Sequence, residues 1–154
     1  DAEVAGLMKS LSETGSYTVR PETLAAIQES FGCGWSSEEE VAGEIRARYE
    51  KDNYLCDTHT AVAAEVMAQY RAATSDDTPT VFVSTASPYK FCGAVLTAIG
   101  ETPRGDGVEL LDQLHEASGV PVPRRLAALK GKTRRFDKTV EKQAMEQAVL
   151  DFLK

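Results

Sequence analysis

The stretch that most constrains how this chain can fold is residues 80–91. Its Val-Phe-Val run at 81–83 has no polar alternation, which is typical of a short strand buried on both faces of a sheet. Small polar residues follow at once, and Pro88 is predicted to begin a helix with Ser87 as its N-cap. Open α/β folds bind their ligands where a strand ends and leads into a helix. The sequence therefore predicts a ligand site at this turn.

The composition is that of one globular domain, residues 1–154. Of the 154 residues, 42% are hydrophobic and 27% are charged, which is ordinary for a globular protein. A chain of this length is large enough to bury a core without disulfide bonds. The net charge of −7 argues against nucleic acid or an anionic membrane as the main partner. No apolar run approaches the roughly 20 residues of a membrane span, and no signal peptide is visible. We therefore expect a cytoplasmic protein.

The three cysteines, Cys33, Cys56 and Cys92, form no C-x-x-C pair. This odd number favours free thiols in a reducing compartment over a disulfide framework or a zinc site, so no metal is expected. Each cysteine has apolar neighbours in the sequence. All three are therefore predicted to be packing residues and not nucleophiles.

Helical periodicity dominates the rest of the chain, and about seven helices are expected. Two overlapping pairs, Ser36/Glu39 and Ser37/Glu40, fit a capping box at the start of the third predicted helix. The predicted helices include 2–13, one that starts at Pro21, one after the acidic run 38–40, 58–73, 88–99, 108–117, and 138–152 with Asp137 as its cap.

The predicted strand, at about 80–85, cannot satisfy its backbone groups alone. Its partners are either weak strands near 17–19 and 54–56 or strands that this chain lacks. The chain also starts with Asp1 instead of methionine, and a helical pattern begins at once. We therefore expect an α/β fold in which this chain is part of a larger body.

Three side chains at the predicted turn could take part in ligand binding. The Thr85 hydroxyl could meet a ring nitrogen or a phosphate, or it could make only a hydrogen bond at the helix start. Ser87 and the amides after Pro88 could bind an anion, or Ser87 could simply cap the helix. Lys90 could support the same anion or remain solvated.

A second candidate pair is Asp57 and His59, where Asp57 is a predicted N-cap. A histidine in the first turn of a helix could bind substrate or transfer protons, or it could be a packed or exposed residue without such a role. No Ser-His-Asp arrangement, P-loop or G-x-G-x-x-G motif occurs. The basic cluster 124–138 could contact a phosphate or an acidic neighbour, but it lacks the aromatic residues typical of nucleic-acid binding.

Two segments of the sequence, residues 54–63 (YLCDTHTAVA) and residues 83–91 (VSTASPYKF), are similar to motifs of a known family. The first resembles the YL-x-D-P-H-T-A-V-A segment of the threonine synthase family, and the second resembles that family's STA-[HS]-P-x-K-F segment. Their order and spacing also match. Thr58 stands where the family has proline, which leaves the turn before the helix less constrained. The resemblance is specific over about residues 4–100 and looser to the end of the chain.

The resemblance implies a helix-rich C-terminal portion of a fold-type-II pyridoxal-phosphate enzyme. The family converts O-phospho-L-homoserine and water to L-threonine and phosphate, with the cofactor as electron sink. Thr85 matches the hydroxyl residue expected to hydrogen-bond the pyridine nitrogen, and a neutral hydroxyl leaves that nitrogen largely unprotonated. Ser84 is a second candidate cofactor contact. The candidate substrate contacts are Lys90, Ser87, His59 and Asp57.

Two parts of the family's site have no counterpart in this sequence. They are the Schiff-base lysine, which lies in an F-K-D segment, and the glycine-rich loop that holds the cofactor phosphate; Lys90 belongs to a different motif. We therefore expect the N-terminal part of the same enzyme as partner, no catalytic residue in this chain, and no activity of the chain alone. The alternatives are an anion-binding or regulatory module that uses the helix at Pro88, and a ligand-free helical interaction domain.

Overall fold

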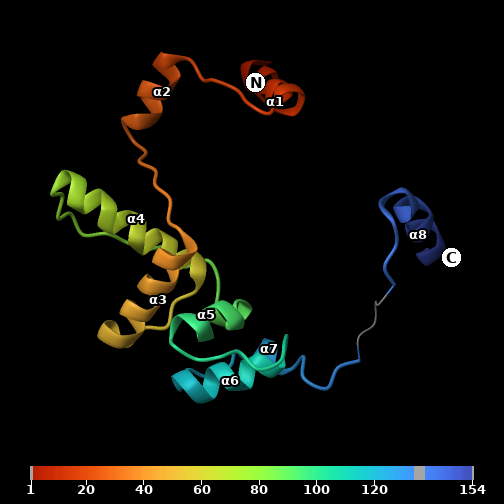
Figure 1. Ribbon diagram of the computed structural model, residues 1–154. Coiled ribbons are helices and arrows are strands. Elements are labelled where there is room, and N and C mark those ends of the chain that lie inside the picture. The colour runs from red at the N-terminus through yellow and green to blue at the C-terminus, as the bar shows by residue number, and fades with distance from the viewer. Residues whose placement is uncertain (1, 134–137, 154) are drawn as a thin grey trace.

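The computed structural model describes residues 2–133 and 138–153, which are arranged as a central group of helices with helical arms at both ends (Figure 1). The described residues form eight α-helices and two short 3-10 turns. They are α1 (Ala2–Thr14), α2 (Pro21–Gln28), α3 (Glu38–Asp52), α4 (Thr58–Thr74), η1 (Pro88–Lys90), α5 (Cys92–Ala98), α6 (Glu109–Ser118), α7 (Arg124–Ala127), η2 (Lys142–Ala144) and α8 (Met145–Phe152).

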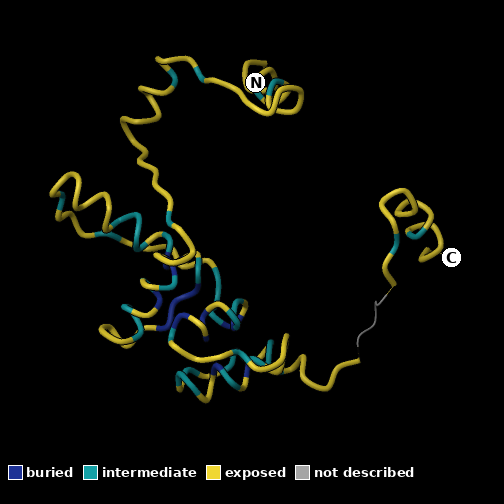
Figure 2. Tube along the Cα trace, in the orientation of Figure 1, coloured by how far each residue is buried: buried dark blue, intermediate teal, exposed yellow. Residues whose placement is uncertain are grey.

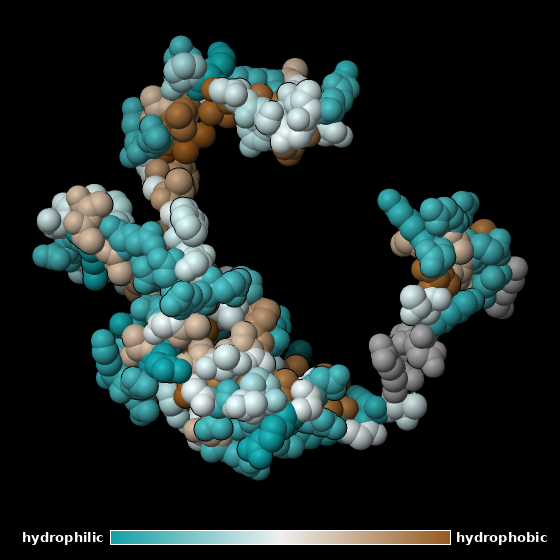
Figure 3. Space-filling view, viewed as in Figure 1, coloured by the Kyte–Doolittle hydropathy of each residue, from teal (hydrophilic) through white to brown (hydrophobic). Residues whose placement is uncertain are grey.

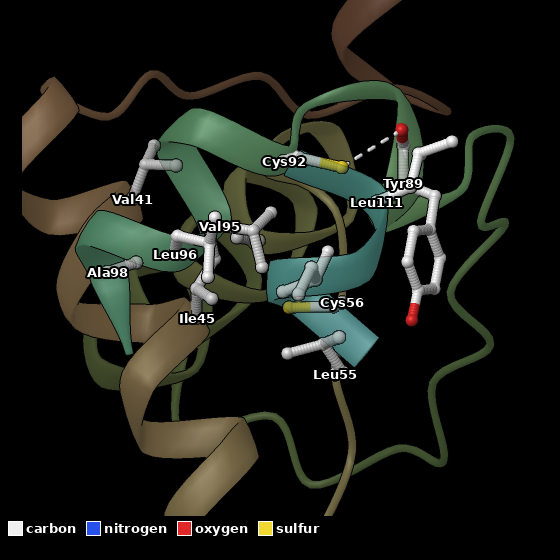
Figure 4. Close-up of a cluster of buried hydrophobic side chains, with 12 residues drawn as sticks. Val41, Ile45, Leu55, Cys56, Tyr89, Cys92, Val95, Leu96, Ala98 and Leu111 are labelled. Carbon is white, nitrogen blue, oxygen red and sulfur yellow. Dashed lines mark hydrogen bonds between the residues drawn. The ribbon is translucent and has the colours of Figure 1, made fainter. Parts of the chain in front are cut away.

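The core lies in the central group, where α3 packs against α4 and α5, and α5 packs against α6. Figure 2 shows the buried residues concentrated there. Ile45 of α3, Leu96 of α5 and Leu114 of α6 are at most 1% exposed. Figure 4 shows the same cluster, in which the Cys92 thiol donates to the carbonyl of Tyr89 at 3.2 Å. The cluster joins segments from four helices, so it fixes the position of the loops between them.

The capping box before α3 is made by Ser37 and Glu40. The Ser37 hydroxyl accepts from the Glu40 amide at 3.3 Å, and the Glu40 carboxylate accepts from the Ser37 amide at 2.7 Å. Of the two predicted pairs, this one is therefore confirmed. The other end of α3 stops at Asn53, whose φ of 53° places it in the left-handed region that ends many helices.

The predicted buried strand at 80–85 is wrong for the described residues. This segment is extended but pairs with no other segment that the structure describes, and Val81 and Val83 are 87% and 77% exposed. The weak candidates at 17–19 and 54–56 form no strand either. A strand requires a neighbour for its backbone groups, and these described segments supply none. The described chain is therefore helical and not α/β.

Two predicted helices are shorter than their periodicity suggests. The expected helix 88–99 is the 3-10 turn η1 followed by α5, because Phe91 between them has a non-helical φ of −129° and ψ of 37°. The expected helix 138–152 is η2 followed by α8. Its predicted cap, Asp137, and residues 134–136 of the basic cluster lie outside the described residues.

Two of the three cysteines are packing residues as predicted. Cys56 and Cys92 are buried, and burial raises the pKa of the Cys56 thiol to about 11 and also raises that of Cys92. Neither thiol is therefore suited to nucleophilic chemistry. The prediction is wrong for Cys33, which is exposed because the loop after α2 lies outside the core cluster.

The terminal helices expose apolar side chains. Figure 3 shows hydrophobic surface along the arm of α1 and α2, where Met8, Ile27 and Phe31 are 45%, 45% and 71% exposed. On α8, Phe152 is 72% exposed. Among the described residues, no helix has the length and apolarity needed to cross a membrane.

Candidate functional site

Asp57 lies at the N-terminus of α4, where the first of the two sequence motifs begins the helix. Its carboxylate caps the helix by accepting from the His59 amide at 2.9 Å. The Asp57 side chain is 0% exposed, whereas that of His59 is 62% exposed. The predicted cap is confirmed, and it places a buried carboxylate beside an accessible imidazole.

The two oxygens of this carboxylate have different side-chain partners. Oδ1 lies 3.2 Å from Nδ1 of His59, and Oδ2 accepts from the Thr60 hydroxyl at 2.5 Å. Burial raises the pKa of Asp57, but hydrogen bonds from the Thr60 hydroxyl, the amides of His59 and Thr60 and the His59 ring outweigh it and hold the pKa below its usual value. The site therefore contains an ionised carboxylate whose oxygens are both engaged.

Thr60 connects this carboxylate to the second motif. The hydroxyl oxygens of Thr60 and Ser84 lie 2.9 Å apart. A hydroxyl has one proton, and that of Thr60 is directed to Asp57, so the Ser84 hydroxyl supplies the proton of the second bond. A hydrogen-bonded series thus runs from His59 through Asp57 and Thr60 to Ser84.

The motifs also meet through two rings. The imidazole of His59 lies with its centroid 5.0 Å from that of Phe91, at an interplanar angle of 50°. This tilted contact is within the range of favourable aromatic pairs. We call the five residues that bring the motifs together the motif junction: Asp57, His59, Thr60, Ser84 and Phe91.

The remaining predicted site residues lie on the same segment without joining this network. Thr85 and Lys90 are exposed, and among the described residues their side chains make no hydrogen bond or ion pair. The Ser87 hydroxyl caps η1 by accepting from the Tyr89 amide at 3.3 Å. Because η1 has three residues, this position lacks the long helix N-terminus that the anion-binding alternative requires.

Sequence reasoning missed two members of the motif junction, Thr60 and Phe91. A signal for Thr60 was present, because an N-cap aspartate faces the residue three positions later. The contact of Phe91 with His59 depends on the break between η1 and α5, which periodicity did not predict.

A groove of about 570 Å³ lies beside the motif junction, and Thr60, Ser84 and Phe82 line it. The two guanidinium groups at its rim are already engaged. Arg48 pairs with Glu44 and Asp52, and Arg71 donates to the carbonyl of Thr78 and the hydroxyl of Thr80.

A second groove of about 940 Å³ lies between α4 and residues 78–83. Phe82 lines both grooves.

Comparison with known proteins gives the family. Residues 60–149, more than half of the chain, match the family described as threonine synthase, C-terminal. The chain belongs to this threonine synthase C-terminal family. The match begins within the motif junction, at Thr60, and includes Ser84 and Phe91.

Individual members of the family agree with this assignment. Threonine synthase from Schizosaccharomyces pombe is 38% identical over 93 residues, which are 60% of this chain and 18% of that protein. Human threonine synthase-like 1 is 29% identical over 93 residues, 60% of this chain and 12% of that protein. The crystal structure of PLP-bound threonine synthase from Brucella melitensis matches with a TM-score of 0.57 and 33% identity, over 79% of this chain and 24% of that one. The matched part of the chain thus covers between 12% and 24% of the length of these three proteins.

Proposed function

We propose that this chain is the C-terminal part of a pyridoxal-phosphate-dependent threonine synthase that converts O-phospho-L-homoserine and water to L-threonine and phosphate. The observation that carries the proposal is the motif junction. It joins two segments, each similar to a family motif, by the Thr60–Ser84 bond and the His59–Phe91 contact. The joined segments contain every side chain assigned to the cofactor or the substrate.

The residues present fit one end of the cofactor, its pyridine ring. Thr85 offers an exposed hydroxyl that makes no other hydrogen bond among the described residues, one position after the tethered Ser84. A hydroxyl can hydrogen-bond a ring nitrogen without a charge, so it favours the unprotonated nitrogen. When bound, pyridoxal phosphate supplies an electron sink for carbanion chemistry. The lysine that carries it and the loop for its phosphate are assigned to the N-terminal part.

Lys90 and His59 are the substrate contacts that the geometry favours. Lys90 is exposed without an ion pair among the described residues, and an ammonium of this kind suits the phosphate of O-phosphohomoserine. His59 exposes one edge of its ring while Asp57 holds the other. Ser87 is engaged as a cap, and Asp57 is buried, so we assign both to the support of the site.

The N-terminal part of the enzyme is the proposed partner. Residues 81–85 are exposed, and the extended segment 80–85 has no strand partner within the described chain, which suits a strand whose neighbours come from elsewhere. The exposed apolar faces of α1, α2 and α8 offer further surface to the same partner. The two threonine synthases from Schizosaccharomyces pombe and Brucella melitensis are roughly three times as long as this chain, so a partner of sufficient size is available.

The test compares this chain alone with the full-length protein that carries it. Each is incubated with pyridoxal phosphate, desalted, assayed for retained cofactor, and then assayed for phosphate release from O-phosphohomoserine. We expect retention and release from the full-length protein and neither from the chain alone. Turnover by the chain alone would contradict the division of the site, and a full-length protein without phosphate release would contradict the assigned reaction.

A further inference from the structure

The Asp57 carboxylate makes more bonds than helix capping requires. Capping uses the bonds from the backbone amides of His59, at 2.9 Å from Oδ1, and Thr60. Oδ1 also lies 3.2 Å from Nδ1 of the His59 ring, and Oδ2 accepts a hydrogen bond from the Thr60 hydroxyl. A serine or threonine could cap the helix equally well but would leave both additional partners without a carboxylate. The additional bonds therefore point to a second role.

We propose that Asp57 is a positioning residue that holds two groups of the site at once. Through Oδ1 it fixes the orientation and tautomer of the His59 imidazole, and through Oδ2 and the Thr60 hydroxyl it holds Ser84, and with it Thr85, in place. This inference deepens the proposed function and rests on it for the identity of the ligands. The geometry of the carboxylate itself does not depend on them.

The first half of the proposal concerns His59. Nδ1 of His59 lies 3.2 Å from Oδ1 of Asp57 and 3.4 Å from the hydroxyl of Thr58. An ionised carboxylate can only accept, so Nδ1 carries the proton of the shorter bond, and the Thr58 hydroxyl is able to accept from the same proton. In the neutral ring, Nε2 then presents a lone pair on the accessible side of a side chain that is 62% exposed. Contact with the ring of Phe91 limits rotation of the imidazole. In this form the His59 ring is prepared to accept a hydrogen bond or a proton from substrate or water through Nε2.

The second half concerns the extended segment. Residues 80–85 have no strand partner within the described chain, so side chains must hold them in place. Two such tethers are present: the Arg71 guanidinium donates to the Thr80 hydroxyl at 3.1 Å, and Thr60 meets Ser84 at 2.9 Å. The second is adjacent to Thr85. Loss of the Thr60 hydroxyl would free the end of the segment that carries the proposed cofactor contact.

Substitutions separate the two halves. Asp57→Ser keeps a capping hydroxyl but removes both additional partners. Thr60→Val removes the hydroxyl that joins Asp57 Oδ2 to Ser84 but leaves the contact between Oδ1 and His59, and Thr60→Ser restores a hydroxyl at the same position. If positioning is the role, the first variant disturbs both His59 and Ser84, the second disturbs Ser84 alone, and the third disturbs neither.

The first measurement reads the tautomer of His59 from the ¹⁵N chemical shifts of its ring in the chain. The chain has two histidines, and His115 serves as an internal reference because its Nδ1 lies 2.8 Å from the carbonyl of Val120, which can only accept. We expect Nδ1–H at His59 in the wild type and in Thr60→Val, and a shift toward Nε2–H in Asp57→Ser. His115 should remain unchanged in all three. Retention of Nδ1–H in Asp57→Ser would overturn the His59 half.

The second measurement is made on the full-length protein by equilibrium dialysis against pyridoxal phosphate. We expect cofactor affinity to fall about tenfold in Thr60→Val, the size of effect typical of residues that orient a ligand-binding group, and to return to within about twofold of wild type in Thr60→Ser. Unchanged affinity in Thr60→Val would overturn the Ser84 half. A wild-type protein that binds cofactor but releases no phosphate from O-phosphohomoserine would instead contradict the proposed function, and the His59 tautomer would still decide the role of Asp57.

Discussion

The hydroxyl oxygens of Thr60 and Ser84 lie 2.9 Å apart although 24 residues separate them. Thr60 is in the first turn of α4, and its hydroxyl is also bonded to the buried Asp57 carboxylate. Ser84 belongs to an extended segment without a strand partner in the described chain. This contact therefore connects a rigid, well-packed part of the molecule to the segment that carries Thr85.

Loss of the Asp57 carboxylate should destabilise the chain in a pH-dependent way. The pKa of Asp57 is lowered in the folded state, so its contribution is fully present above the unfolded value of about 3.9 and is lost as pH falls through the lower folded value. Asp57→Asn should lower the free energy of unfolding by about 1–3 kcal/mol at pH 7, and the difference from wild type should shrink in acid. Urea denaturation across pH measures this. Asp77→Asn, at an exposed position, is the control, and a pH-independent difference for Asp57→Asn would be inconsistent with the lowered pKa.

The capping box before α3 gives a matched pair of variants. Ser37→Ala removes the hydroxyl that caps the helix and should cost about 1 kcal/mol. Ser36→Ala removes a buried hydroxyl that has no partner among the described residues, so it should be neutral or slightly stabilising. Thermal denaturation of both variants checks the order. Equal losses would mean that the box does not stabilise α3.

The loop before α3 lies close to α4, and substitution of two glycines in this loop tests that contact. A methyl group added at Gly34 would lie 2.6 Å from Cγ1 of Val66, whereas one added at Gly32 meets nothing within 4 Å. Gly34→Ala should therefore cost about 1 kcal/mol, the low end for overpacking because the loop is exposed and can shift. Gly32→Ala should be tolerated. A loss that persists unchanged when Val66 is replaced by alanine would indicate a different cause.

If residues 80–85 pair with a strand of the N-terminal part, a substitution at Val83 should affect the full-length protein but not this chain alone. Val83 is 77% exposed, so Val83→Lys should leave the melting temperature of the chain unchanged. In the full-length protein the same change would bury a charge at a strand, and it should strongly lower stability. Val83→Thr, which keeps a β-branched side chain, serves as control in both proteins. Equal melting temperatures for full-length wild type and Val83→Lys would argue against pairing at this segment.

Local patterns were sufficient to predict most of the helices and two of their caps. The capping box at Ser37 and the N-cap at Asp57 were predicted correctly because they depend on side chains within three residues of each other. The fit to the threonine synthase motifs also correctly predicted the family. These features need no information about distant parts of the chain.

The errors arose where the outcome depends on distant partners. The Val-Phe-Val run has the composition of a buried strand, but composition cannot supply the neighbouring strands, and in the described chain the run is exposed. Phe91 fits a helical period, yet it lies at the break between η1 and α5, where its ring meets His59. The Thr60–Ser84 bond likewise depends on how residues 75–83 return along α4, which no local pattern determines.

The central claim, that Thr85 holds the cofactor ring, is tested most directly by measuring cofactor affinity and phosphate release in the full-length protein with Thr85→Val and Thr85→Ser. Valine keeps the shape but removes the hydroxyl, and the lost hydrogen bond should weaken binding about tenfold. Serine keeps the hydroxyl and should bind as wild type within about twofold. If Thr85→Val retains cofactor and releases phosphate from O-phosphohomoserine as the wild type does, the assignment of Thr85, and with it the proposed site, is contradicted.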